Sequence, residues 1–213
     1  NIRAKQWRQM AVLSKLLLLG AGNAAFYAGA AGMLDEGVGW GLYGGFYLLI
    51  ALILTMGRRL VPFFTERGVS PPVTLRNVFA LDMASLALLL VFWVAEVFLR
   101  ASAVAAACAA GVCAVNAVRL VLWYTPGILG RPLLWSLHAA LALIATGFGL
   151  RALAEVAPVS PFLGLHTMAI GGIGLVTLSM MARVSLGHTG RSVHAPPRIV
   201  ALPLALLLAS VLL

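Results

Sequence analysis

Long apolar stretches separated by short polar connections make up most of this chain. A helix needs about 20 apolar residues to cross a bilayer. Seven stretches approach that length, the last of them short: 11–32, 38–57, 78–99, 102–122, 133–154, 161–183 and 199–213. The alternation of apolar and polar positions that marks membrane strands is absent. The pattern therefore predicts an all-α fold, a polytopic transmembrane helical bundle that forms one unit over residues 1–213.

Composition supports a membrane protein. The chain of 213 residues is 62% hydrophobic and 10% charged, whereas a soluble domain has about a quarter charged residues. The net charge of +9 does not indicate nucleic-acid binding, because no basic patch is interleaved with aromatic residues. Cys108 and Cys113 lie five residues apart in one apolar stretch, on opposed helix faces, so no disulfide is expected between them.

The basic residues predict how the bundle is oriented. Thirteen of the fifteen lie in the first 15 residues or near the connections after the second, fourth and sixth stretches: Arg3, Lys5, Arg8, Lys15, Arg58, Arg59, Arg67, Arg76, Arg119, Arg131, Arg183, Arg191 and Arg198. Only Arg100 and Arg151 belong to the opposite side. The positive-inside rule then places the N-terminal flank and the 184–198 loop in the cytoplasm. The chain lacks an initiator methionine and ends within an apolar stretch, so we expect a piece of a longer protein.

Three histidines, His138, His166 and His188, are the first candidates for chemistry, since neutral imidazole is a common metal and haem ligand. His138 lies near the start of the fifth stretch and His166 near the start of the sixth, which runs the opposite way. The two should therefore differ by roughly 15 Å in depth. Either two sites exist, or each histidine pairs with another group, or each bonds a neighbouring helix. His194 lies in a proline-flanked loop and is a weaker, supporting candidate.

Methionines and an acid share the predicted depth of His138. Met180 and Met181 end the sixth stretch, and thioether with imidazole suits Cu(I) or a haem axial position. Packing is the alternative role for both methionines. Asp82 begins the third stretch, where it would either orient an imidazole or pair with Arg76 or Arg59.

Arginines at this side of the bundle are candidate partners for an anion, because guanidinium groups match carboxylates in paired hydrogen bonds. The candidates are Arg59, Arg119, Arg183 and Arg191. Positive-inside topology alone would also place arginines there.

Small and polar residues inside the stretches predict helix contacts. Gly37, Gly41 and Gly45 recur every four residues and form one small-residue stripe that allows close helix approach. Asn116 is expected to form a hydrogen bond to another helix. Glu96 is expected to reach water or Arg100.

Four segments resemble the NnrS family of bacterial membrane proteins. They are MM-A-RVSLGHTGR over residues 180–191, LHTMAIGGIG over 165–174, RPLLWSLH over 131–138 and GRRLVPFFT over 57–65. Their order and spacing agree with the family, so the resemblance covers nearly the whole chain. Arg58 stands where the family has the second glycine of a predicted turn.

The resemblance implies a bundle of about twelve spans, of which this chain would be the C-terminal half. It implies a haem- and copper-associated inner-membrane protein linked to nitric oxide tolerance. Nitric oxide or a related small ligand, and an electron donor, would be partners besides the lipid bilayer. The three histidines become candidate haem or copper ligands, and the four arginines candidate propionate partners. The family's histidine-rich segment has no counterpart here, so the metal site would be incomplete.

A second function remains open at this point. Asp82, Asn116 and Glu96 lie in or near the stretches and would suit the path of a transporter or channel for a small anion or metal species. No arrangement of residues indicates a particular reaction, so the sequence does not decide whether the protein is an enzyme.

Overall fold

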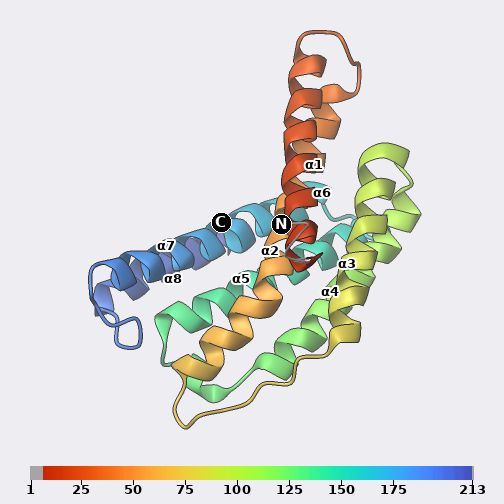
Figure 1. Ribbon diagram of the computed structural model, residues 1–213. Coiled ribbons are helices and arrows are strands. Elements are labelled where there is room, and N and C mark those ends of the chain that lie inside the picture. Colours follow the sequence, from red (N-terminus) through yellow and green to blue (C-terminus); the bar gives the residue numbers. More distant parts are fainter. Residues whose placement is uncertain (1–6, 213) are drawn as a thin grey trace.

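The computed structural model in Figure 1 describes residues 7–212 and is built from helices. The α-helices are α1 (Trp7–Ala30), α2 (Gly37–Gly68), α3 (Phe79–Val94), α4 (Ser102–Trp123), α5 (Pro132–Leu153), α6 (Pro161–His166), α7 (Leu175–His188) and α8 (Ala201–Ala209). Two π-helices, η1 (Ala95–Leu99) and η3 (Thr167–Gly174), continue α3 and join α6 to α7. Short 3-10 turns are η2 (Pro126–Ile128), η4 (Arg198–Val200) and η5 (Ser210–Leu212). No strand occurs within 7–212, which confirms the all-α prediction.

Six helices are long and apolar enough to cross a membrane. They cover Val12–Ala30, Gly37–Gly68, Phe79–Leu99, Ser102–Trp123, Pro132–Leu153 and Pro161–His188. The apolar helix Arg198–Ala209 is shorter. About seven spans were expected, and the helices agree with that expectation. Arg3 and Lys5 of the basic N-terminal flank lie outside the described residues.

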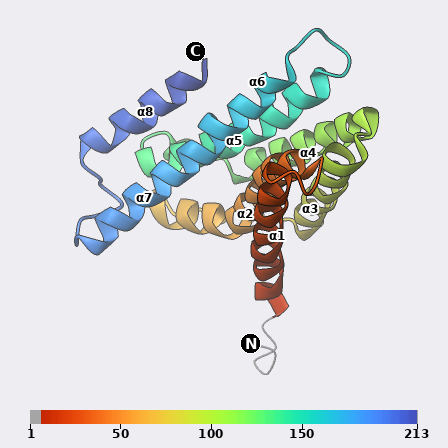
Figure 2. The ribbon, with the colours of Figure 1, turned by 90° about the horizontal axis from the view of Figure 1, so that it is seen from above.

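Helix α5 lies at the centre of the bundle. It packs on α4 and α2 and, on another side, on α6, η3 and α7. Figure 2 shows α5 running alongside the α6–α7 span, with α3 and α4 on the far side of α5 and α1 projecting away from the rest. Tyr47, Phe92, Ile144 and Phe148 are fully buried where α2, α3 and α5 meet. Because α5 touches most other helices, its side chains point into several separate spaces.

Helix α2 continues eleven residues beyond the predicted end of its apolar stretch. A turn was expected where Arg58 replaces the family's second glycine, but residues 57–65 are helical throughout, although Pro62 lies inside. Val61 and Thr65 stay buried on the same side of the helix as Leu54, and this packing compensates for the hydrogen bond that proline cannot donate. The predicted turn at Arg58 is therefore wrong, and Arg58 lies on a helix.

Helix α7 also extends further than predicted, from 183 to His188. Gly187 is helical, and only Gly190, with φ of +69°, provides the left-handed backbone that turns the chain. The Arg191 amide donates to the Leu186 carbonyl and closes this turn. The segment 180–191 is thus mostly helix, and the loop predicted over 184–198 begins only after His188.

Glycines bring α1 and α2 into backbone contact. A Cβ at Gly37 would lie 2.4 Å from the Ala25 carbonyl oxygen, and a Cβ at Gly41 would lie 2.6 Å from that of Gly22. Gly45 faces open space. The predicted stripe is therefore confirmed for Gly37 and Gly41 and wrong for Gly45. Since α1 packs mainly on α2, these contacts hold α1 in place.

We expect Gly41→Ala to loosen α1 from α2. The added methyl group has no space against backbone atoms, and overpacking of this kind costs about 1–3 kcal/mol. Gly45→Ala is the matched control, because it changes the same residue type one turn away with nothing within 4 Å. It should be neutral or slightly stabilising. Protease cleavage of the 31–36 connection measures the difference; equal cleavage of both variants would contradict the expectation.

Candidate functional site

A network of charged and polar side chains is buried among α2, α3 and α4. Arg58 Nη1 lies 3.6 Å from Asp82 Oδ2, and Arg119 Nη2 lies 3.4 Å from Asp82 Oδ1. Arg119 Nη1 donates to Asn116 Oδ1 at 2.9 Å, and Asn116 Nδ2 donates to the Ser85 hydroxyl at 3.0 Å. Asp82 and Arg119 are only 4% and 5% exposed. The network joins three spans, and the predicted interhelical bond of Asn116 is confirmed.

Local sequence places each member of this network. Asp82 lies in the first turn of α3, where a carboxylate is favoured by the helix dipole. Ser85 follows it by three residues and Arg119 follows Asn116 by three, so each pair shares a helix face. The Arg119 guanidinium also stacks over Trp123, with Cζ 4.6 Å from the ring centroid.

Positive charge exceeds negative charge in the network. Two guanidinium groups share one carboxylate, and Arg58 Nε and Arg119 Nε are buried without a hydrogen-bond partner. Arg59 and Arg76 were the partners expected for Asp82, but both are exposed and neither pairs with it. No hydrogen bond links Asp82 to any described histidine. Asp82 is therefore a counter-ion for Arg58 and Arg119, and the expected partners were wrong.

His138 lies two turns into α5 with one ring nitrogen satisfied. Its Nδ1 lies 3.0 Å from the Leu134 carbonyl oxygen, which fixes the ring along the helix. Its Nε2 is buried and has no hydrogen-bond partner, although the Trp123 carbonyl lies near the ring. A buried polar atom without a partner is costly unless something else binds it. A ligating imidazole has the same carbonyl contact at Nδ1 and presents Nε2 to the metal.

His138 lines a wide groove between α4, α5 and α8. The groove has a volume of about 610 Å³, within the range of small-molecule and cofactor sites. Tyr124 and Trp135 line it beside His138, and its other walls are apolar: Leu120, Ile128, Leu129, Ala139, Ala142 and Leu208. This shape and composition suit a flat, largely apolar group that one imidazole would hold.

The other histidines do not join His138. Two contacts show which residues of α5 and of the α6–α7 span lie at the same level. The hydroxyls of Ser136 and Ser179 lie 2.8 Å apart, and Gly147 packs against Gly164. His166 is therefore level with a point on α5 about nine residues beyond His138, which corresponds to roughly 14 Å. The predicted difference in depth is thus supported. His166 is exposed in a separate groove of about 360 Å³, next to the π-helix η3.

Both remaining histidines lie at the surface of the described structure. His188 ends α7 and is exposed, and His194 is exposed in the following loop, where its carbonyl accepts from Arg131. Within residues 7–212, no three histidine, cysteine or acidic side chains come together as a metal site. Cys108 and Cys113 are free, as expected.

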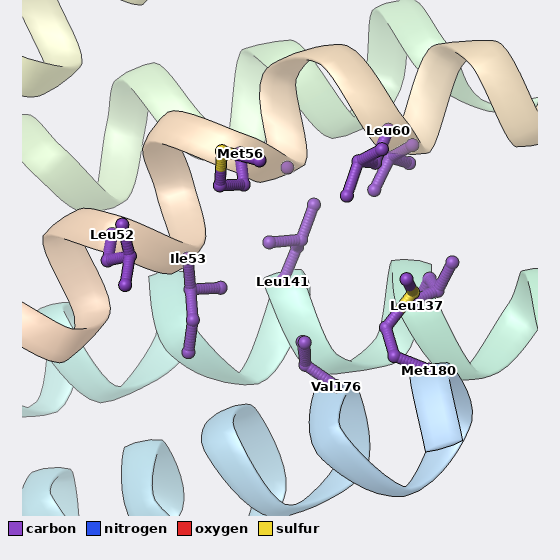
Figure 3. A pocket seen from close by; sticks show the side chains of 10 residues that line it. Leu52, Ile53, Met56, Leu60, Leu137, Leu141, Val176 and Met180 are labelled. Atoms are coloured by element: carbon purple, nitrogen blue, oxygen red, sulfur yellow. The ribbon is translucent and has the colours of Figure 1, made fainter. Parts of the chain in front are cut away.

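Met180 faces a different cavity from His138. Figure 3 shows this cavity, about 150 Å³ in volume, between α2, α5 and α7. Met56 and Met180 reach it from opposite walls, with Leu137 and Leu141 between them. Met181 is 62% exposed. The structure therefore pairs neither methionine of 180–181 with His138, and the cavity in Figure 3 is apolar.

The arginines of the candidate set are distributed differently. Arg183 lies over the Phe64 ring, with Cζ 4.1 Å from the ring centroid, and donates to the Leu133 carbonyl at 3.1 Å. It ties α7 to α2 and to the start of α5. Arg59 and Arg191 are exposed. Of the four candidates, only Arg119 belongs to the buried network. The second arginine of that network is Arg58, which was not among the candidates.

A second set of ion pairs closes the opposite end of the bundle. Arg151 on α5 donates twice to Glu96 in η1, from Nε at 2.8 Å and from Nη2 at 2.7 Å. Arg100 instead pairs with Glu36 at the surface. The expected Glu96–Arg100 pair was therefore wrong.

Six membrane-length helices with ionisable side chains buried between them define a polytopic α-helical membrane protein. The chain belongs to the NnrS family: the family model described as NnrS protein matches residues 1–213. No curated protein and no solved structure matches it. Family membership agrees with the four segments that carried the resemblance.

Proposed function

We propose that this protein binds haem through His138 in the bacterial inner membrane and contributes to tolerance of nitric oxide. The observation that carries the proposal is the buried Nε2 of His138, which has no hydrogen-bond partner and lies beside a groove of cofactor size. Membership in the NnrS family supports the association with haem and nitric oxide that the sequence resemblance implies.

The residues around His138 fit a haem. The Leu134 carbonyl holds Nδ1, so Nε2 is the nitrogen that would hold the haem iron. Tyr124 and Trp135 offer aromatic surface in an otherwise apolar groove, which matches the body of a porphyrin. Ferrous haem, when bound, supplies an iron that binds nitric oxide. The chain itself would orient the group and keep water away from it.

The apolar cavity of Figure 3 supports the choice of nitric oxide as the ligand. It lies on another side of α5, and its lining has almost no polar surface, so it excludes ions. A small uncharged molecule such as nitric oxide can dissolve there from the membrane. We further propose that the end of the bundle that carries Arg58, Arg119 and Arg183 faces the cytoplasm.

Copper does not fit the described residues in the same way. A copper site needs several converging nitrogen or sulfur ligands. His138 and Met180 line different cavities, and no cluster of three histidine, cysteine or acidic side chains exists in 7–212. We therefore propose haem, and not copper, as the group that His138 binds.

The absorption spectrum of the purified protein tests this function. We expect a Soret band in the wild type and a loss of haem of at least about tenfold in His138→Ala, because the imidazole that would hold the iron is removed. His188→Ala is the matched control, since His188 is exposed at a helix end, and its spectrum should not change. Added imidazole should restore part of the band in His138→Ala, which a purely structural role would not allow. No Soret band in the wild type, or an unchanged band in His138→Ala, would refute the proposal.

A further inference from the structure

The groove that contains His166 lies between α2 and the helical segment formed by α6 and η3. Its volume of about 360 Å³ is within the range of small-molecule sites. Most of its lining is apolar: Leu42, Phe46, Phe162, Leu165 and Ala169. Tyr43 on α2 and His166 on α6 are the two lining residues with a polar group in the side chain. The groove shares no lining residue with the groove of His138.

Tyr43 and His166 both lie inside membrane-length helices. Tyr43 follows Gly37, the first residue of its span, by six residues, and His166 follows Pro161 by five. At 1.5 Å per residue, each is roughly 8–9 Å from the end of its helix. The second and sixth spans run in the same direction, so the two side chains that share the groove also share a depth.

Neither polar group of this groove has a partner. Within residues 7–212, the Tyr43 hydroxyl and the His166 ring form no hydrogen bond. Hydrocarbon cannot replace that partner, and an ionisable side chain inside a span is by default part of a functional site. The π-helix η3 begins directly after His166, and π-helical turns are frequent at functional sites. The groove therefore fits a ligand that dissolves in lipid and accepts hydrogen bonds.

We propose that this groove binds the headgroup of a membrane quinone. The Tyr43 hydroxyl donates to one carbonyl oxygen and the His166 imidazole donates to the other. The two donors come from different helices, which matches the position of quinone carbonyls on opposite edges of one ring. The ring packs against Phe46 and Phe162, and the isoprenoid tail continues into the bilayer. An acyl chain would fill the same space but leave both donors without an acceptor.

Binding of decylubiquinone to the purified full chain, measured by isothermal titration calorimetry in detergent, tests the proposal. Tyr43→Phe and His166→Phe should each weaken binding about fivefold, because each removes one hydrogen bond and keeps an aromatic ring. Tyr27→Phe and His188→Phe are the matched controls, since both residues are exposed and lie outside the groove, and they should leave binding unchanged. Decylbenzene, which has the ring and the tail without the carbonyl oxygens, should bind much more weakly than decylubiquinone.

A further pair of variants tests the space in the groove independently of hydrogen bonds. Ala169→Phe fills the groove and should weaken decylubiquinone binding, whereas Ala107→Phe, at an exposed position of α4, should not. Equal binding of decylbenzene and decylubiquinone would overturn the proposal, because the groove would then be a lipid contact. Unchanged binding by Ala169→Phe, or by both Tyr43→Phe and His166→Phe, would also overturn it. So would a loss of haem in His166→Phe, since His166 would then be a haem ligand; the haem proposed at His138 is tested separately by its own variant.

Discussion

Asp82→Asn is expected to destabilise the folded bundle by about 3–5 kcal/mol, because it removes the one carboxylate that Arg58 and Arg119 share. Both guanidinium groups would remain buried with no counter-ion. Asparagine keeps the size of the side chain, so the loss is one of charge and not of packing. The free energy of unfolding in detergent, from denaturant titration followed by circular dichroism, measures the effect.

Two controls separate this loss from a general effect of charge. Asp35→Asn changes the same residue type at an exposed position and should cost almost nothing. Arg119→Gln combined with Asp82→Asn should cost less than the sum of the two single changes, since each partner is harmful mainly when left alone. A cost below about 1 kcal/mol for Asp82→Asn, or strict additivity of the pair, would mean that the network does not stabilise the bundle.

The sequence predicts the number and type of helices well because membrane helices carry a strong pattern. A lipid-spanning helix must be apolar over most of its length, so α3 with its continuation η1, α4 and α5 end within a residue or two of their predicted limits. The ends of α2 and α7 were placed too early for one physical reason. Arginines in the sequence indicate the start of a water-exposed connection, whereas Arg58 and Arg183 lie on helices and pack against other spans.

The partners of buried charges could not be predicted with the same success. Which arginine faces Asp82 depends on how α2 is rotated, and composition does not determine rotation. The rotation of α2 can be inferred from its helical pattern. Leu54, Val61 and Thr65 recur at helical spacing on both sides of residue 57, and Arg58 lies beside that buried stripe. Extending the helix through Pro62 would have identified Arg58 as an inward-facing residue.

The depth of the histidines was predictable, but their surroundings were not. Antiparallel neighbours fix depth, so the sequence could separate His138 from His166. Whether a ring nitrogen is satisfied depends on side-chain geometry, and the free Nε2 of His138 has no counterpart in the pattern of residues. The same limit applies to Met180, which shares a depth with His138 but faces the cavity on another side of α5.

Arg151→Gln is expected to cost about 2–3 kcal/mol at the opposite end of the bundle. Glu96 would lose two charge-assisted hydrogen bonds and remain partly buried, with its side chain only 21% exposed. Arg100→Gln is the matched control, because it breaks another arginine–glutamate pair at the same end whose members are 70% and 47% exposed. That pair is screened by solvent, so its loss should cost less than about 1 kcal/mol.

The comparison of these two variants shows whether burial is the reason that the Arg151–Glu96 pair stabilises the folded protein. Glu96→Gln should destabilise the protein much as Arg151→Gln does, because it leaves the guanidinium of Arg151 without its bidentate partner. Raising the salt concentration should reduce the already small effect of Arg100→Gln and leave that of Arg151→Gln nearly unchanged. If both arginine variants lose the same free energy of unfolding, the pair acts as a surface contact.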